Sequence, residues 1–179
     1  MKYTITVAAF GLIAACSEPA SNGSGDAQAP AETAQTATTE DMADDISTVD
    51  TVKTVYDGFA TGDIALATSN FAESIVWTEA ENSPYADQNP YEGTDEIVTG
   101  LFARLGGEWE YFNAVPSEFI AEGNRVVSLG RYTAKHGETG KEMDIPFVHV
   151  WTVEDGEITS FQQYTDTLAH SAVMTADPE

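Results

Sequence analysis

Basic residues are scarce in this sequence: seven Lys and Arg stand against 30 Asp and Glu, which gives a formal net charge of −23. Nucleic-acid binding needs clustered Lys and Arg opposite the phosphates, so the composition argues against a nucleic-acid partner. It argues equally against a contact with anionic lipid headgroups. The excess of acid fits a solvated, self-repelling surface that keeps the protein in solution.

Cysteine occurs once, at Cys16, so the chain cannot form an internal disulfide. The apolar stretch of residues 5–15 is too short to span a bilayer, and with Lys2 before it and small residues after it, it is typical of a secretory signal. Ile13-Ala14-Ala15-Cys16 is similar to the bacterial lipobox, in which the cysteine becomes the lipidated N-terminus. The sequence therefore predicts a lipoprotein signal peptide over residues 1–16. The alternative is that Cys16 is an ordinary small residue of a cleaved signal.

Aromatic residues are absent from residues 17–44, a composition that cannot bury enough apolar surface to fold. We expect a disordered tether there, followed by one folded domain at residues 45–177. Ser17, next to the cysteine, resembles the pattern of lipoproteins sent to the outer membrane. The expected location is the bacterial cell envelope, with a lipid anchor in the outer membrane and the domain facing the periplasm.

In the first part of the predicted domain, apolar residues recur at the spacing of a helix. They predict one helix from residue 45 to Ala60 that Gly62 ends, and a short second helix that Asp63 caps. Residues 74–79 alternate as a strand. A third helix is predicted from an N-cap at Thr94 to the glycine pair at residues 106–107.

The remainder of the domain alternates at strand spacing, with turns between the segments. Four antiparallel strands are predicted at residues 108–122, 125–135, 143–153 and 158–165, and a short last helix follows, capped by Asp166 or Thr167. Three N-terminal helices on the concave face of a curved antiparallel sheet make an α+β cone.

Several local motifs, in this order, resemble the SnoaL-like branch of the nuclear transport factor 2 (NTF2-like) superfamily, which includes ketosteroid isomerase. The likeness covers roughly residues 49–174. It is carried by Thr61-Gly62-Asp63, Phe71-Ala72, Val76-Trp77, Tyr91-Glu92-Gly93, Phe147-Val148-His149-Val150-Trp151, Asp155-Gly156-Glu157-Ile158 and Tyr164-Thr165-Asp166-Thr167. The resemblance implies one deep apolar pocket and a homodimer packed through the outer face of the sheet. It leaves the activity open, because this fold hosts enzymes, binders and docking domains.

Two residues that could carry chemistry follow from the resemblance. Glu79 falls where the isomerase has its general base, and His149 falls where the isomerase has its protonated acid and the cyclases have a catalytic histidine. The implied reaction is removal of a proton beside a carbonyl by Glu79, with a hydrogen bond from His149 to the developing enolate. Two positions depart from the pattern: the isomerase's helix tyrosine falls nearest Val55, one residue before Tyr56, and the cyclase's aspartate falls at Gln163.

The same two residues fit a protein without catalysis. Glu79 can be a carboxylate at a pocket mouth, either solvated or paired with Arg104 or Arg131. His149 can be a hydrogen-bonded pocket histidine with no part in a reaction.

Aromatic residues of the domain are predicted to form the pocket wall. The expected ligand-binding residues are Trp77, Tyr85, Tyr91, Phe102, Phe147, Trp151, Phe161 and Gln163. His136 and His170 lack metal-ligand spacing, so we predict no metal and no cofactor.

Three functions remain open at this point. The first is binding of a small, mostly apolar molecule in the cone. The second is an isomerase-type or cyclase-type enzyme, and the third is a non-catalytic dimerisation or docking domain.

Overall fold

The computed structural model of the protein describes residues 39–178, so the predicted signal peptide, Cys16 and most of the predicted tether lie outside the described residues. The first helix, α1 (Thr39–Thr61), begins before residue 45. The last residues assigned to the tether are therefore helical, and the expected boundary at residue 44 is placed too late. Within the described range no helix is long and apolar enough to cross a membrane.

Helix α1 turns its apolar stripe to the sheet and buries Val52, Val55 and Tyr56. It ends at Thr61 because Gly62 adopts a left-handed backbone with φ of 70°. Asp63 then caps α2 (Ile64–Ala67), where its side chain accepts a hydrogen bond from the Leu66 amide at 2.9 Å. The predicted end of the first helix and the predicted cap of the second are confirmed.

The third helix is continuous but irregular: α3 (Thr94–Glu96) runs into a π-helical segment, η2 (Ile97–Phe102), and then into α4 (Ala103–Glu108). Gly93, not Thr94, is its N-cap. The prediction that the glycine pair stops this helix was wrong, because neither Gly106 nor Gly107 has a positive φ and both remain helical. The helix ends at Glu108, where the backbone of the buried Trp109 becomes extended.

Six strands form one sheet in the order β2-β1-β6-β5-β4-β3, and a short 3-10 helix, η1 (Ala86–Gln88), precedes β2. The strands are β1 (Phe71–Thr78), β2 (Tyr91–Glu92), β3 (Trp109–Glu122), β4 (Arg125–His136), β5 (Glu142–Glu154) and β6 (Glu157–Thr165). Strands β3 to β6 pair antiparallel in chain order, as predicted. The sheet is nevertheless mixed, because β1 lies parallel to β6. β1 and β6 lie far apart in the chain, so no tight turn between them determines whether they pair parallel or antiparallel.

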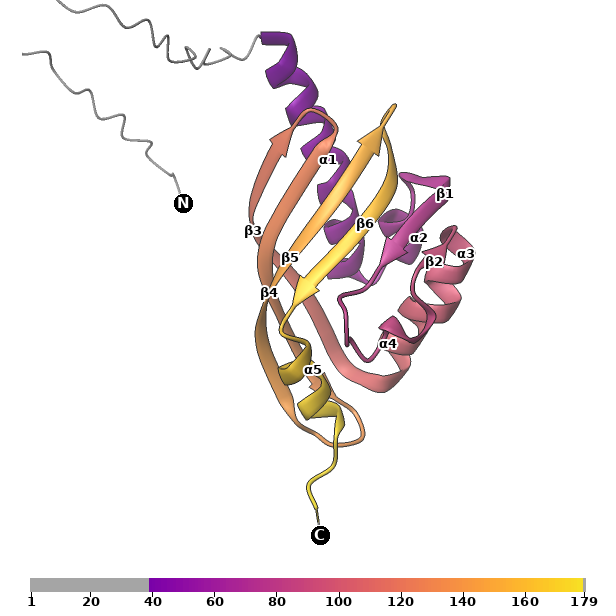
Figure 1. Cartoon of the computed structure of the whole chain (residues 1–179), viewed down its shortest axis with the longest axis vertical. Helices are drawn as coiled ribbons and strands as arrows, with labels where there is room; N and C mark the ends of the chain where they lie inside the picture. The colour runs from indigo at the N-terminus through magenta and orange to yellow at the C-terminus, as the bar shows by residue number, and fades with distance from the viewer. Residues whose placement is uncertain (1–38, 179) are drawn as a thin grey trace, which may run out of the picture. The chain divides into compact units, whose positions relative to one another are not determined.

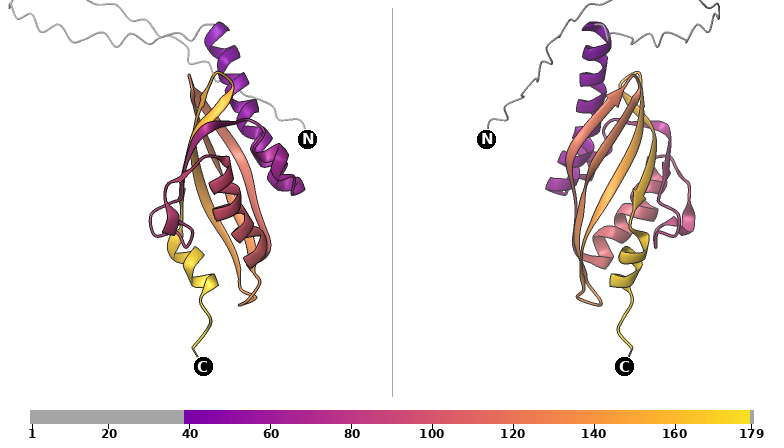
Figure 2. Two further views of the ribbon diagram at one scale, coloured as in Figure 1. Left: turned by 90° about the vertical axis from the view of Figure 1, so that its right-hand side faces the viewer. Right: turned by 60° about the vertical axis from the view of Figure 1, so that its left-hand side comes forward.

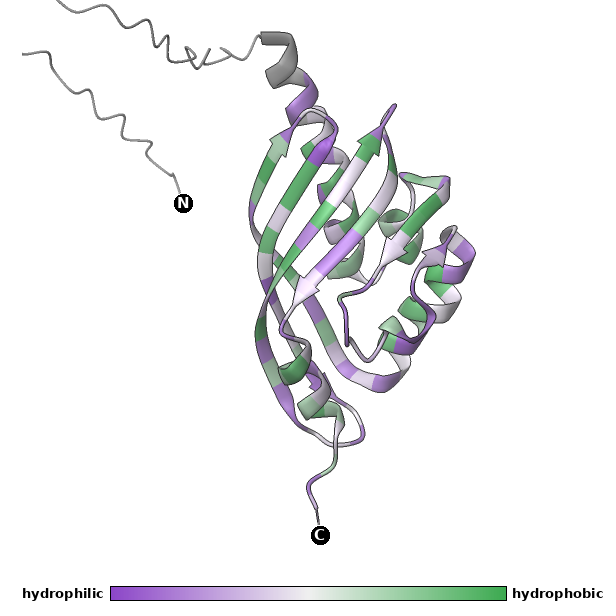
Figure 3. Ribbon diagram, viewed as in Figure 1, coloured by the Kyte–Doolittle hydropathy of each residue, from purple (hydrophilic) through white to green (hydrophobic). Residues whose placement is uncertain are grey.

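Buried residues alternate with less buried ones along β4 and β5, so one face of the sheet is buried. Hydrophobic and hydrophilic residues are interspersed along the strands (Figure 3). Helix α1 and the third helix both lie on the buried face (Figures 1 and 2). Helix α5 (Thr167–Met174) follows directly from β6 and is capped by Asp166, whose side chain accepts from the Ala169 amide at 2.9 Å. The predicted α+β cone is confirmed.

Candidate functional site

A cavity of about 280 Å³ lies between the buried face of the sheet and the helices. Aromatic rings from different elements line it, including those of Phe59, Trp77, Phe102, Trp109, Phe112 and Trp151. Ile64 and Tyr111 also line it and are 36% and 41% exposed, and the cavity is partly open to solvent. A partly open cavity of this lining suits a small, mostly apolar molecule.

Glu79 is held at the inner end of β1 with its side chain on the cavity and only 4% of its surface exposed. The Asn89 side chain accepts from the Glu79 amide at 2.9 Å and donates to the Glu79 carbonyl at 2.8 Å. The Asn89 side chain thus makes the two backbone hydrogen bonds that a neighbouring strand would make, and it holds the Glu79 backbone in place. Trp77 Nε1 donates to Glu79 Oε1 at 2.8 Å.

Burial raises the pKa of Glu79 to about 7, although hydrogen bonds from Trp77 and Gln163 act in the opposite direction. Neither arginine considered from the sequence offsets this. Arg104 pairs with Asp87 at 2.8 Å, and Arg131 pairs with Asp144. Among the described residues no ion pair reaches Glu79. Neither form of the alternative interpretation, the solvated or the arginine-paired carboxylate, is therefore seen.

His149 lines the same cavity from β5, and both of its ring nitrogens are engaged. Nδ1 lies 2.7 Å from the Tyr56 hydroxyl, and Nε2 lies 2.5 Å from the Tyr132 hydroxyl. Burial lowers the pKa of His149 well below its usual value, so the imidazole is neutral at pH 7. A neutral imidazole donates at one nitrogen and accepts at the other, which matches two hydroxyl partners.

These hydroxyls extend the network in both directions from His149. Tyr132 accepts from Gln163 Nε2 at 3.0 Å, while the Gln163 oxygen accepts from the Ala80 amide at 3.3 Å. On the other side the Tyr56 hydroxyl lies 2.5 Å from Ser128 Oγ, which also accepts from Trp151 Nε1 at 2.9 Å. The Gln163 amide is thereby oriented with its NH₂ group toward Tyr132.

The structure brings the two predicted chemical residues to one cavity but changes the expected role of His149. A ligand can take a hydrogen bond from His149 only if a bond to Tyr56 or Tyr132 breaks. Tyr132 also lines the cavity, and its hydroxyl can donate to a ligand while it accepts from His149.

The predicted wall residues divide into two groups. Trp77, Tyr85, Phe102, Trp151 and Gln163 line the cavity. The other three are buried behind it: Tyr91 donates to the Tyr85 carbonyl at 2.7 Å, Phe147 stacks on His149 at 4.0 Å, and Phe161 stacks on Trp77 at 3.6 Å.

Sequence reasoning missed Tyr56, Tyr132 and His170 as site residues. Tyr56 belongs to the predicted helical stripe, one residue from the position that the resemblance indicated. Alternation along β4 would have placed Tyr132 on the inner face of the sheet. No local pattern places its hydroxyl on His149.

A family model of the SnoaL-like domain matches residues 52–161. No curated protein matches the chain. Among solved structures, an NTF2-like protein from Burkholderia thailandensis is 34% identical, with a TM-score of 0.68 over 72% of this chain and 97% of that one. TerC, co-crystallised with polyporic acid, is 26% identical, with a TM-score of 0.66 over 72% of this chain and 98% of that one.

A more distant structure shows the fold alone. A protein from Catenulispora acidiphila with a ketosteroid isomerase-like fold, in complex with trimethylamine, is 16% identical. Its TM-score is 0.60 over 72% of this chain and 94% of that one.

Proposed function

The chain belongs to the SnoaL-like domain family, and we propose that its domain binds a small, mostly apolar molecule with a carbonyl or similar oxygen in the cavity. One observation carries the proposal: a buried carboxyl, Glu79, faces an aromatic-lined cavity without a cationic partner among the described residues. Keeping an unpaired carboxyl there costs free energy, which a purely structural core would avoid. Co-crystallisation of TerC, a 26% identical protein, with polyporic acid supports a small organic ligand.

Two matched variants test binding. Ala114 lines the cavity from β3, so Ala114→Trp fills it, while the neighbouring Val115 is 54% exposed, so Val115→Trp adds the same bulk outside. Protein purified without denaturation is then analysed by mass spectrometry for small molecules released on unfolding. We expect a molecule in the wild type and in Val115→Trp but not in Ala114→Trp. Equal loading of all three would contradict binding in the cavity.

A second candidate function, proton transfer, is favoured because Glu79 and Tyr132 line the same cavity. The Glu79 carboxylate would take a proton from the carbon next to the ligand's carbonyl, and the electron pair of that C–H bond would move toward the carbonyl oxygen. Tyr132 would donate to that oxygen. If the ligand has a C=C bond next to the deprotonated carbon, return of the proton to the far carbon of that bond would shift the double bond and complete an isomerisation. With a pKa near 7, Glu79 is about half ionised at neutral pH.

His149 acts in this scheme as a positioning residue. If its proton lies on Nε2, Tyr132 accepts from both His149 and Gln163, and the Tyr132 hydrogen is free for the ligand. Nδ1 then accepts from Tyr56, and Tyr56 accepts from Ser128. In this arrangement the hydroxyls of Tyr56 and Ser128 each donate one hydrogen bond and accept one.

The reaction is tested by exchange of the ligand's acidic hydrogen for deuterium in D₂O, followed by mass spectrometry of the bound molecule. Glu79→Gln should slow exchange by about 100-fold or more while changing the dissociation constant by less than about tenfold. Exchange at the wild-type rate would remove Glu79 as the base and leave the binding proposal standing.

We also propose that the protein is held at the cell envelope by a lipid on Cys16, which lies outside the described residues. The support is the signal-like segment of residues 1–16 and its lipobox-like end. Cys16→Ser should move the protein from the membrane fraction to the soluble fraction of the cells that make it. Continued sedimentation with the membranes would count against the anchor.

A further inference from the structure

His170, on α5, lines the cavity and is 1% exposed, yet neither of its ring nitrogens has a hydrogen-bond partner among the described residues. His149 lies on the same cavity with both nitrogens bonded. A buried polar atom without a partner is unfavourable, and few occur in native proteins. His170 therefore lacks the hydrogen bonds that satisfy His149 in the same cavity.

The aromatic neighbours of His170 make their hydrogen bonds elsewhere, and neither ring nitrogen of His170 receives one. The rings of Tyr85, Trp109 and Phe112 surround it at centroid distances of 5.7, 5.4 and 5.9 Å. Trp109 Nε1 donates to the Tyr85 hydroxyl at 2.7 Å, and that hydroxyl donates to Glu108 at 2.6 Å. A molecule in the cavity can supply the missing partner, because His170 lines that cavity.

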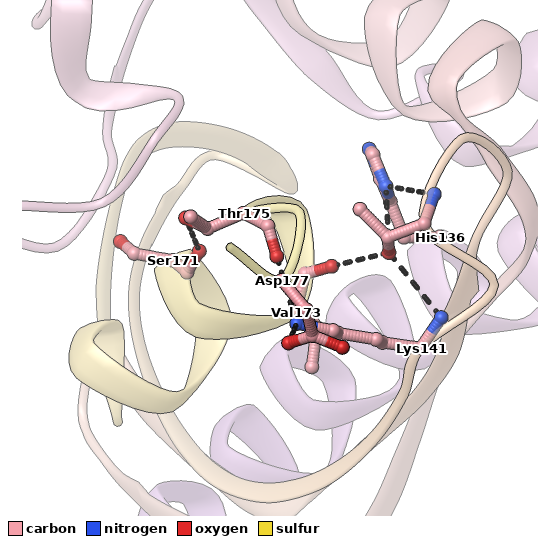
Figure 4. Close-up of polar contacts among 7 residues, drawn as sticks. His136, Lys141, Ser171, Val173, Thr175 and Asp177 are labelled. Atoms are coloured by element: carbon pink, nitrogen blue, oxygen red, sulfur yellow. Dashed lines mark hydrogen bonds and ion pairs between the residues drawn. The ribbon is translucent and has the colours of Figure 1, made fainter. Parts of the chain in front are cut away.

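The position of His170 is set by the ends of its helix and not by its own side chain. Asp166 caps the start of α5. Near its end, Thr139 Oγ1 donates to the Val173 carbonyl at 2.5 Å, and Lys141 Nζ donates to the Thr175 carbonyl at 2.8 Å and to Asp177 at 2.6 Å (Figure 4). Hydrogen bonds from the turn between β4 and β5 thus hold α5 in place, and they fix the position of His170 on the cavity.

We propose that His170 is a second polar contact for the ligand and binds a hydroxyl group on a neutral, ring-containing molecule, apart from the Glu79–Tyr132 network. This inference rests on the proposed function, since it requires a molecule in the cavity. A neutral imidazole can donate to a hydroxyl oxygen and accept from a hydroxyl hydrogen, and burial lowers the pKa of His170 to about 4. The aromatic walls favour a flat ring system, and the acidic protein disfavours an anion.

Three probes of similar shape test the proposal: naphthalene, 2-naphthol and 2,6-dihydroxynaphthalene. Their dissociation constants are measured by calorimetry or fluorescence for the wild type, His170→Phe and Leu168→Ala. Leu168 is the matched control, because it lies on the same helix and is 82% exposed. His170→Gln is included because an amide keeps one donor and one acceptor.

For the wild type and Leu168→Ala, we expect the second hydroxyl of 2,6-dihydroxynaphthalene to improve affinity over 2-naphthol by about tenfold. His170→Phe should abolish that gain and leave naphthalene binding within about twofold, while His170→Gln should keep part of it. The thermal midpoint of His170→Phe should not fall, since the change removes two unpaired polar atoms.

Two outcomes would overturn this inference. If the probes bind and His170→Phe retains the gain from the second hydroxyl, the role of His170 is wrong and the proposed cavity function stands. If no probe binds the wild type, the cavity does not take neutral aromatic molecules and this inference fails, while the proposed binding function is decided by the mass spectrometry of the Ala114→Trp protein.

Discussion

At the scale of single residues, the cavity holds groups whose protonation is controlled by burial. Burial raises the pKa of Glu79 and lowers the pKa of His149 and His170, so each is pushed toward its neutral form. These shifts affect stability in opposite directions. Below about pH 6.5 the unfolded chain binds protons at both histidines more readily than the folded domain does, so lowering the pH lowers the free energy of unfolding. Glu79 holds its proton more tightly in the folded domain, so its effect on the free energy of unfolding has the opposite pH dependence.

Glu79→Gln isolates the carboxyl. Because the folded pKa of Glu79 lies above its unfolded value, its destabilising effect grows as the pH rises from about 4.5 to about 7 and is constant above that range. The variant should gain stability over the wild type through this window, by roughly 3 kcal/mol at its upper end. Urea unfolding of both proteins from about pH 4.5 to 8 measures the difference, in which the histidine terms cancel. A difference independent of pH would contradict the raised pKa.

At the scale of elements, the spacing between β3, β4 and β5 shapes the wall behind the site. Gly130 on β4 lies where the backbone of Val115 and Pro116 and the ring of Phe147 come close. Phe147 in turn stacks on His149 at 4.0 Å. The absence of a side chain at Gly130 therefore allows the ring that supports His149 to sit in place.

Gly130→Ala should disturb both packing and binding. Its Cβ would clash with the Phe147 ring and with backbone atoms of β3, which cannot move aside without distorting the sheet. We expect a loss of about 1–3 kcal/mol in the free energy of unfolding and weaker ligand binding.

Gly107→Ala is the control for this prediction, because a Cβ there meets no atom within 4 Å and Gly107 is helical. It should be neutral or stabilising by up to about 1 kcal/mol. Equal unfolding free energies for Gly130→Ala and the wild type would show that the strands separate more easily than the structure indicates.

At the scale of the whole molecule, charge dominates. The chain carries a formal net charge of −23, and the salt bridges of the described residues, such as Lys53 with Asp50, lie on the surface, where each stabilises little. Repulsion between like charges then opposes the compact state.

Added salt should therefore stabilise the domain. Raising NaCl from about 10 mM to about 0.5 M shortens the screening length from roughly 30 Å to below 10 Å, which weakens the repulsion. The thermal midpoint should rise by several degrees, as measured by circular dichroism, and potassium chloride should act like sodium chloride. A midpoint that falls with salt would show that attractive surface pairs outweigh the repulsion.

Features that depend on neighbouring residues can be predicted from the amino-acid sequence. The four long strands, the cap at Asp63 and the cap at Asp166 follow from alternation, turns and short-range hydrogen bonds, which act within a few residues. Alternation also assigns His149 and Trp151 to one face, and both are buried there.

Contacts between groups far apart in the chain depend on how the whole domain packs. The parallel pairing of β1 with β6, the bonds from Tyr56 and Tyr132 to His149, and the unpaired nitrogens of His170 join positions far apart in the chain. The third helix continued through two glycines because the burial of Trp109 fixed its end. Such contacts arise from packing the whole core, whose free energy no local pattern contains.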